Sequence, residues 1–120
     1  MTQVGGFFWA ADNSGARHLK CIQRPSGLFD VGDLLRMSVK KVARKRKYKL
    51  EKGSVVKAVV SELKLKQNRP SGTGFKSDFN TVIVLNSKGE PLGSRLVCLG
   101  PHELRRKGWP KLFGMIRKSF

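Results

Sequence analysis

Basic side chains are concentrated in residues 40–49, where seven of the ten positions are lysine or arginine. Burying charges at this density would leave ammonium and guanidinium groups unpaired, at a free-energy cost that packing does not offset. We therefore expect a loop that projects from the protein and contacts phosphate groups; a solvated loop or a nuclear localisation signal is the alternative. The seven bases are Lys40, Lys41, Arg44, Lys45, Arg46, Lys47 and Lys49.

Further bases occur on both sides of this run. One group falls on the expected strands or in the hairpin that follows them: Arg17, Lys57, Lys64, Lys66 and Arg69. A second group lies near the C-terminal end: Arg105, Arg106, Lys107, Lys111, Arg117 and Lys118. Basic regions this far apart in the sequence indicate more than one contact with nucleic acid.

Few residues could support catalysis or metal binding. Four side chains could in principle form a zinc site, namely His18, Cys21, Cys98 and His102. Their spacing matches no known zinc motif, so we interpret them as core or surface residues. The acids are scattered, and Asp12 and Asp33 are interpreted as turn caps rather than catalysts. Because no phosphate-binding glycine loop, His-Glu-x-x-His motif or nucleophile elbow occurs, we expect no catalytic residues, no metal and no cofactor.

The overall charge narrows the class of partner. The 120 residues include 25 Lys and Arg but 8 Asp and Glu, giving a formal net charge of +17 at pH 7. Self-repulsion at this charge disfavours a compact monomer, so a polyanionic partner is expected and nucleic acid is favoured. An anionic membrane surface is the second candidate, but it usually requires a long amphipathic basic helix, which this sequence does not predict.

Short β-strands separated by turns must position these bases. Residues 35–40 alternate apolar and basic or polar side chains, which predicts one core-facing and one charged face. The nearly continuous apolar run at residues 55–60 predicts a strand buried on both sides. Residues 67–75 are the expected tip of a protruding hairpin. The expected strands cover residues 7–11, 17–24, 34–43, 54–66 and 81–85.

These elements predict a mainly β protein with one domain, residues 1–120. Five or six short strands favour a small barrel or sandwich over about residues 1–100. Residues 101–120 differ in character. A proline in the first turn, an early acid, late bases and a following glycine predict a short helix over residues 100–108. Residues 111–116 are a second short element.

Five sequence blocks, in order along nearly the whole chain, carry a resemblance to one family. The first is Ala-Asp-Asn-Ser-Gly-Ala-Arg at residues 11–17. The others lie within residues 31–41, 52–60, 84–95 and 100–105. One block would be weak evidence, but five in this order closely resemble the universal large-subunit ribosomal protein L-fourteen family.

The resemblance implies a small five-stranded β-barrel with short C-terminal helices, and a structural role in the large subunit. It also implies that the bases between residues 17 and 69 named above bind large-subunit rRNA. In that family the basic loop and the C-terminal segment touch small-subunit rRNA across the subunit interface. The bridge residues implied in this way are Arg44, Lys45, Arg46, Lys47, Arg117 and Lys118.

The resemblance further implies protein partners. The expected neighbours belong to the universal L-three and bacterial-type L-nineteen families, and no membrane partner is expected. A ribosome-silencing factor docks in that family on a Gly-Thr/Ser-Arg segment and a lysine of the final helix. The matching residues here are Ser94, Arg95 and Lys111.

The chain also departs from the usual pattern of that family. Its loop at residues 40–52 looks longer and far more basic, and residues 77–81, 93–101 and 115–120 differ from the familiar motifs. These departures favour a divergent ribosome in the mitochondrial matrix over the bacterial cytoplasm or a plastid. The presence of two cysteines, too few for a disulfide scaffold, fits a reducing compartment.

Two other functions compete with this interpretation. A free single-strand-binding barrel would carry exposed aromatic residues on which bases stack. The aromatic residues cluster at residues 7–9 and 109–120, apart from the basic loop in the sequence, which favours phosphate and shape contacts over stacking. A hydrolase that uses His18 or His102 is the least favoured alternative.

Overall fold

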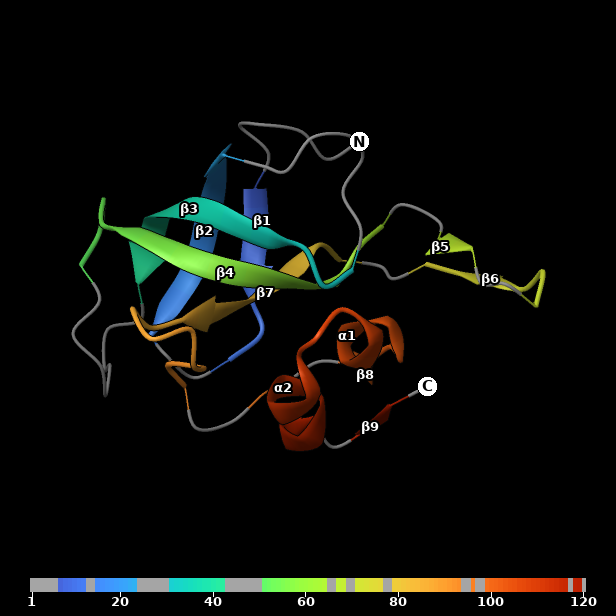
Figure 1. Cartoon of the computed structure of the whole chain (residues 1–120). Helices are drawn as coiled ribbons and strands as arrows, with labels where there is room; N and C mark the ends of the chain where they lie inside the picture. Colours follow the sequence, from blue (N-terminus) through green and yellow to red (C-terminus); the bar gives the residue numbers. More distant parts are fainter. Residues whose placement is uncertain are drawn as a thin grey trace.

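Five strands close into a barrel in the order β1-β2-β3-β4-β7 (Figure 1). Neighbouring strands pair antiparallel, except that β1 and β7 meet in parallel. The five-stranded barrel expected from the sequence is therefore confirmed. The barrel strands are β1 (Phe7–Ala10), β2 (Ala16–Gln23), β3 (Leu34–Val42), β4 (Val55–Glu62) and β7 (Thr81–Leu85). The computed structural model describes residues 7–12, 15–23, 31–42, 51–64, 67–68, 71–76, 79–93, 96, 99–116 and 118–119.

Alternation of side chains along β3 separates the core from the charged surface. Leu35, Met37 and Val39 are buried inside the barrel, whereas Arg36 and Lys40 are exposed. This is the pattern that a half-buried strand requires, because successive side chains point to opposite faces. The predicted division of this strand into an apolar and a charged face is confirmed.

Strand β4 departs from the expectation of a strand buried on both sides. Val55 is 58% exposed and Val56 is partly buried, and continuous burial begins only at Ala58. The reason lies in the register: β7 pairs with β4 from Lys57 onward, so the first two residues of β4 extend past the end of β7. The prediction was wrong for this end of the strand.

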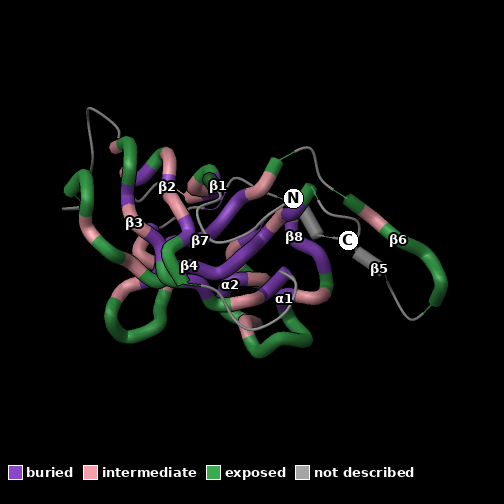
Figure 2. Tube along the Cα trace, turned by 90° about the horizontal axis from the view of Figure 1, so that it is seen from above, coloured by how far each residue is buried: buried purple, intermediate pink, exposed green. Residues whose placement is uncertain are grey.

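The second half of β4 and all of β7 are buried, as the tube in Figure 2 shows. Two short helices, α1 (Glu103–Arg106) and α2 (Pro110–Met115), lie beside these strands in Figure 1. Leu104 and Leu112 of the helices belong to the same apolar cluster as the barrel interior. The C-terminal segment thus covers the outside of the barrel at β4 and β7, and the two short elements expected there are present.

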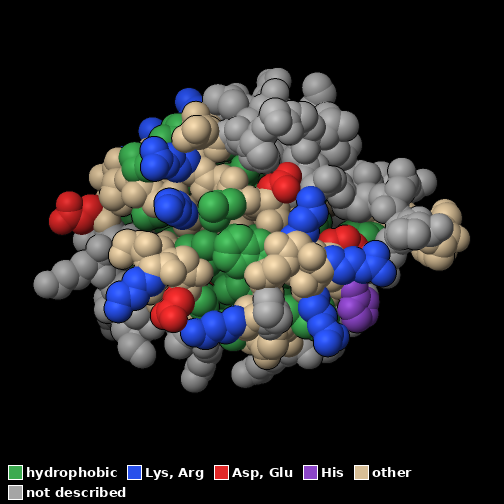
Figure 3. Space-filling model, in the orientation of Figure 1, with side chains coloured by type: hydrophobic (Ala, Val, Ile, Leu, Met, Phe, Trp, Pro, Cys, Tyr) green, Lys and Arg blue, Asp and Glu red, His purple; other side chains and the backbone are tan. Residues whose placement is uncertain are grey.

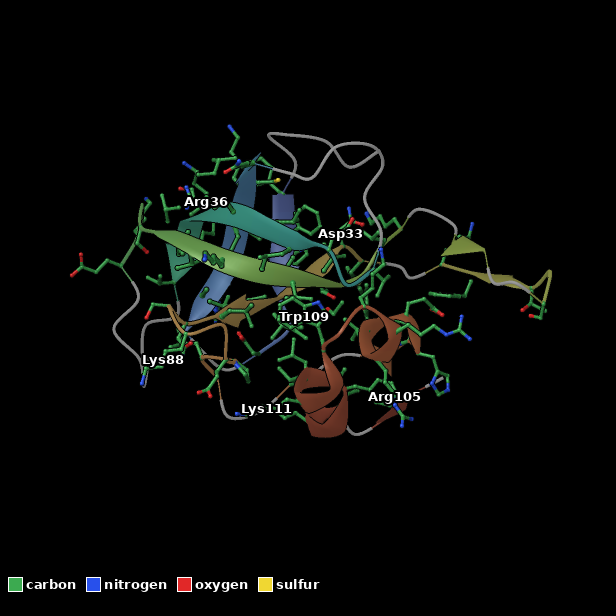
Figure 4. The ribbon with its side chains drawn as sticks, in the orientation of Figure 1. Asp33, Arg36, Lys88, Arg105, Trp109 and Lys111 are labelled. Atoms are coloured by element: carbon green, nitrogen blue, oxygen red, sulfur yellow. The ribbon has the colours of Figure 1, made fainter. Side chains whose placement is uncertain are left out.

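One side chain fastens this C-terminal segment to the barrel. Trp109 lies between the helices and the strands (Figure 4), and its indole Nε1–H donates a 2.9 Å hydrogen bond to the carbonyl oxygen of Gly32. Gly32 has a φ of 92°, and a Cβ there would lie 2.7 Å from Cγ of Lys107. Glycine is therefore required both by the backbone conformation and by the close approach of the C-terminal segment.

Two acids interpreted as turn caps also make contacts well beyond their own turns. The backbone N–H of Val84 donates to Oδ2 of Asp12 at 3.1 Å, which links the end of β1 to β7. Asp33 forms a 3.6 Å ion pair with Lys107, beside the Trp109 contact. Turn chemistry alone does not predict these contacts, because they join residues more than seventy positions apart.

Two small two-stranded units complete the fold. β5 (Gln67–Asn68) and β6 (Gly74–Phe75) form an antiparallel hairpin that stands away from the barrel in Figure 1, as predicted for this segment. β8 (Leu99–Gly100) and β9 (Lys118–Ser119) pair in parallel and bring the two ends of the C-terminal segment together.

Replacing Trp109 by Phe tests the attachment of the C-terminal segment. The change keeps an aromatic ring but removes the N–H that bonds Gly32, so we expect the free energy of unfolding to fall by about 1–2 kcal/mol. Urea denaturation followed by circular dichroism measures this loss. The control is Trp9→Phe, at a ring that is 51% exposed, where a change below about 0.5 kcal/mol is expected. Equal losses in the two variants would contradict this role of Trp109.

Candidate nucleic-acid interface

The outer face of β2, β3 and β4 carries a band of basic side chains. Of the six bases in this band, Lys20 is half-buried and the other five are exposed. None of the six forms an ion pair within the part of the chain that the structure describes. On the face drawn in Figure 3, Lys and Arg side chains occupy more of the surface than Asp and Glu side chains do. We call this set the strand-face bases: Arg17, Lys20, Arg36, Lys40, Lys41 and Lys57.

Two of these bases oppose each other directly. The register of β3 and β4 pairs Arg36 with Lys57, both exposed. Like charges in opposite positions on neighbouring strands are destabilising, and no described acid compensates them. Figure 4 shows Arg36 on the side of the barrel away from the helices. A ligand with repeated negative charge would remove this repulsion.

Irregular pairing between β2 and β3 raises the charge density further. Ala16 and His18 pair with the consecutive residues Val42 and Lys41, and the register shifts again before Leu19 pairs with Val39. Each shift leaves one residue without a paired position, Arg17 on β2 and Lys40 on β3, and both are exposed. The two shifts therefore bring three strand-face bases and a histidine to one end of this strand pair.

Aromatic side chains lie next to these bases. Phe7 and Trp9 on β1 are 54% and 51% exposed, and His18 contacts both rings at centroid distances of 5.7 and 4.1 Å. His18 in turn pairs with Lys41, the second residue of the basic run, and Lys20 Nζ lies 5.9 Å from the centroid of Phe7. Phe7 and Trp9 thus lie beside bases of the strands, whereas residues 43–50 of the basic loop, from which the sequence sets the aromatic residues apart, lie outside the described residues. Sequence reasoning missed the bases beside Phe7 and Trp9 because strand pairing, and not distance along the chain, creates the contact.

The remaining predicted bases are distributed as follows. Lys64 is exposed just beyond β4. The loop bases Arg44, Lys45, Arg46, Lys47 and Lys49 lie outside the described residues, as do Lys66, Arg69 and Arg117. Lys118 is in β9, and its side chain is not described.

The C-terminal segment carries a second group of bases. Arg105 and Arg106 are exposed on α1 and, with His102, line an open depression. Figure 4 shows Arg105 directed away from the barrel. His102 also stacks on Phe113, at 5.5 Å between ring centroids. Neither Arg105 nor Arg106 forms an ion pair with a described residue, so both guanidinium groups are available to an anionic ligand.

One predicted docking residue is placed by the structure. Lys111 is exposed on α2 and forms a 3.5 Å ion pair with Glu90, and both side chains are more than half exposed. Ser94 and Arg95 lie outside the described residues. An exposed ion pair of this kind contributes little to stability, so Lys111 is readily released to another partner.

Of the candidate metal and catalytic residues, the structure describes His18, Cys21 and His102, which it does not bring together as a metal site. His18 lies on β2, His102 precedes α1, and the thiol of Cys21 is buried near the carbonyl oxygen of Gln23, 3.6 Å away. Within the described ranges, no group of three or more His, Cys, Asp and Glu side chains could hold a metal ion. Cys98 is outside these ranges.

None of the helices in the described ranges is long and apolar enough to cross a membrane.

Comparison with known protein families gives a match that spans nearly the whole chain. The family described as ribosomal protein L14p/L23e matches residues 1–119. This family comprises structural constituents of the large ribosomal subunit and is generally not enzymatic. The resemblance inferred from the five sequence blocks is therefore confirmed. With its closed five-stranded barrel and a match over 119 of 120 residues, this chain belongs to the ribosomal protein L14p/L23e family.

Proposed function

We propose that this chain binds large-subunit rRNA through its strand-face bases. The observation that carries the proposal is the direct pairing of Arg36 with Lys57, two exposed cations without a compensating acid among the described residues. Such an arrangement costs stability in the free protein and is relieved when phosphate groups approach. Placement on a closed barrel favours recognition of backbone shape over base sequence, because phosphate contacts fix position and orientation.

The mechanism is neutralisation of phosphate with release of counterions. Each base that contacts a phosphate displaces condensed cations from the RNA, and this release drives binding. The register shifts in β2 and β3 support several such contacts within a small area, since they crowd Arg17, Lys40 and Lys41 together. Exposed Lys64 and the arginines of α1 offer further contacts. The chain carries no catalytic role in this proposal.

The salt dependence of rRNA binding tests this function. In a variant with both Arg36→Gln and Lys57→Gln, the slope of log affinity against log salt should become shallower by about 1.4–1.8, because two phosphate contacts are lost. Lys88→Gln, in the exposed turn after β7, is the control and should leave the slope unchanged. Figure 4 shows Lys88 and Arg36 in different parts of the molecule. Identical slopes for the unaltered chain, the double variant and the Lys88→Gln control would rule out the strand face as the rRNA interface.

The basic loop is proposed to serve a different purpose, the bridge to small-subunit rRNA. It follows β3, near whose end Lys40 and Lys41 are already exposed on the strand face. Bases on a rigid strand suit anchoring to the large subunit, whereas bases on a connecting segment can extend across a gap. Arg117 and Lys118 of the C-terminal segment are proposed as a second bridge.

Neutralising Lys45, Arg46 and Lys47 together, each to Gln, should separate bridging from anchoring. We expect the variant chain to enter large subunits normally but to weaken joining of the two subunits, measured by sucrose-gradient sedimentation at increasing salt. The comparison variant, Arg17→Gln with Lys57→Gln, should instead reduce incorporation into the large subunit. If the loop variant instead failed to enter large subunits and the strand variant weakened only subunit joining, the roles proposed for the loop and the strands would be exchanged.

Protein partners and location complete the proposal. Neighbours of the L-three and L-nineteen families are proposed, as is docking of a silencing factor on Ser94, Arg95 and Lys111. The exposure of Lys111 supports that last proposal, since only the weak pair with Glu90 must be replaced. A mitochondrial ribosome is proposed as the location, supported by the unusually basic segment at residues 40–52.

A further inference from the structure

The outer face of β1 and β2 exposes a cluster of aromatic rings that the barrel core does not use. Phe8, between Phe7 and Trp9, is fully buried, so the alternation of β1 directs its two neighbours outward. The strand register pairs Phe7 with Lys20 and Trp9 with His18. We call Phe7, Trp9 and His18 the aromatic platform.

The platform is ordered before any ligand arrives. His18 stacks on Phe7 with an interplanar angle of 26° and meets Trp9 edge to face at 71°. These are the two favourable geometries for aromatic pairs, and they restrict the side-chain rotamers of both exposed rings. Because less conformational entropy is then lost on binding, the platform is prepared for a flat ligand.

The charge around the platform indicates which flat ligand it accepts. Lys20 lies over Phe7, Lys41 is paired with His18, and Arg17 precedes His18 in the same strand. None of these cations forms an ion pair in the described ranges of the chain. Aromatic rings beside uncompensated bases suit an unpaired nucleotide, whose base stacks on a ring while its phosphate meets a cation. A protein partner would need an acidic surface to satisfy the same bases.

The geometry points to a stacking site for single-stranded RNA on the aromatic platform: one or two unpaired bases rest on Phe7 and Trp9, and their phosphates contact Lys20, Arg17 and Lys41. This inference rests on the proposed rRNA binding and extends it, since the strand-face bases alone do not distinguish single from double strands. Duplex RNA keeps its base faces inside the helix and offers the platform nothing to stack on.

The test compares one single strand with one duplex. Binding of a labelled oligouridylate of about eight nucleotides, and of an RNA duplex of the same length, is measured by fluorescence anisotropy for the full chain and its variants. Trp9→Leu should weaken single-strand binding by about five-fold to a hundred-fold and leave duplex binding unchanged. Its salt slope should equal that of the unaltered chain, because no phosphate contact is removed. An abasic strand should bind both proteins equally.

Two further variants serve as controls. Ile22→Ala alters a 44% exposed apolar side chain on β2 outside the platform and should leave both affinities unchanged. Lys20→Gln should make the salt slope shallower for both RNAs while the single strand keeps its sensitivity to Trp9→Leu. Thermal unfolding of Trp9→Leu establishes that the variant is folded, and Phe7→Leu provides a second variant of the platform.

The outcomes distinguish failure of the stacking site from failure of the proposed rRNA binding. If both platform variants bind the single strand as tightly as the unaltered chain, or lose duplex binding equally, the stacking site is wrong although rRNA binding stands. If they keep RNA binding but fail to bind a purified neighbouring ribosomal protein, the platform is a protein interface and the inference is overturned. If the unaltered chain binds neither RNA, the proposed function itself fails.

Discussion

Uncompensated positive charge on a rigid β-barrel is the constraint on which the rest of this molecule depends. The net charge is +17 on 120 residues, and the outer face of β2, β3 and β4 collects several of the bases without a described acid to pair with them. A flexible chain would spread such charges apart. The closed barrel instead holds Arg36 opposite Lys57, so the repulsion persists in the free protein.

The remainder of the fold keeps that face rigid. Buried side chains fill the barrel, and the C-terminal segment covers the outside of β4 and β7 through Leu104 and Leu112. Trp109 and the ion pair of Lys107 with Asp33 hold this segment against the turn before β3. The C-terminal segment and the strand-face bases thus lie on different parts of the barrel wall. The segment can therefore pack on the barrel without burying these bases.

Much of the fold could be predicted because local chemistry determines it. Turn residues marked the ends of the strands to within a few positions, and the alternation at residues 35–40 assigned the two faces of β3. Val55 was assigned wrongly because its burial depends on how far β7 extends along β4, which is a matter of register. The contact of Trp109 with Gly32 joins residues 77 apart and has no local signal.

The candidate site was predictable in composition but not in arrangement. The types of residue indicated phosphate binding, and Arg17, Lys40, Lys41, Lys57 and Lys64 are exposed. The loop residues 44–47 and the pair Ser94 and Arg95 stay predictions, since they lie outside the described residues. The meeting of Trp9, His18 and Lys41 follows from two register shifts, which no periodicity in the sequence announces.

Lysine acylation read by mass spectrometry gives the most direct test of the strand face as an rRNA interface. Intact large subunits containing this chain would be compared with the free protein, and with the same subunits after ribonuclease digestion. The account predicts that Lys40, Lys41 and Lys57 react slowly in the intact subunit and regain the reactivity of the free protein once the RNA is digested. Reactivity in the intact subunit equal to that of the free protein would contradict it.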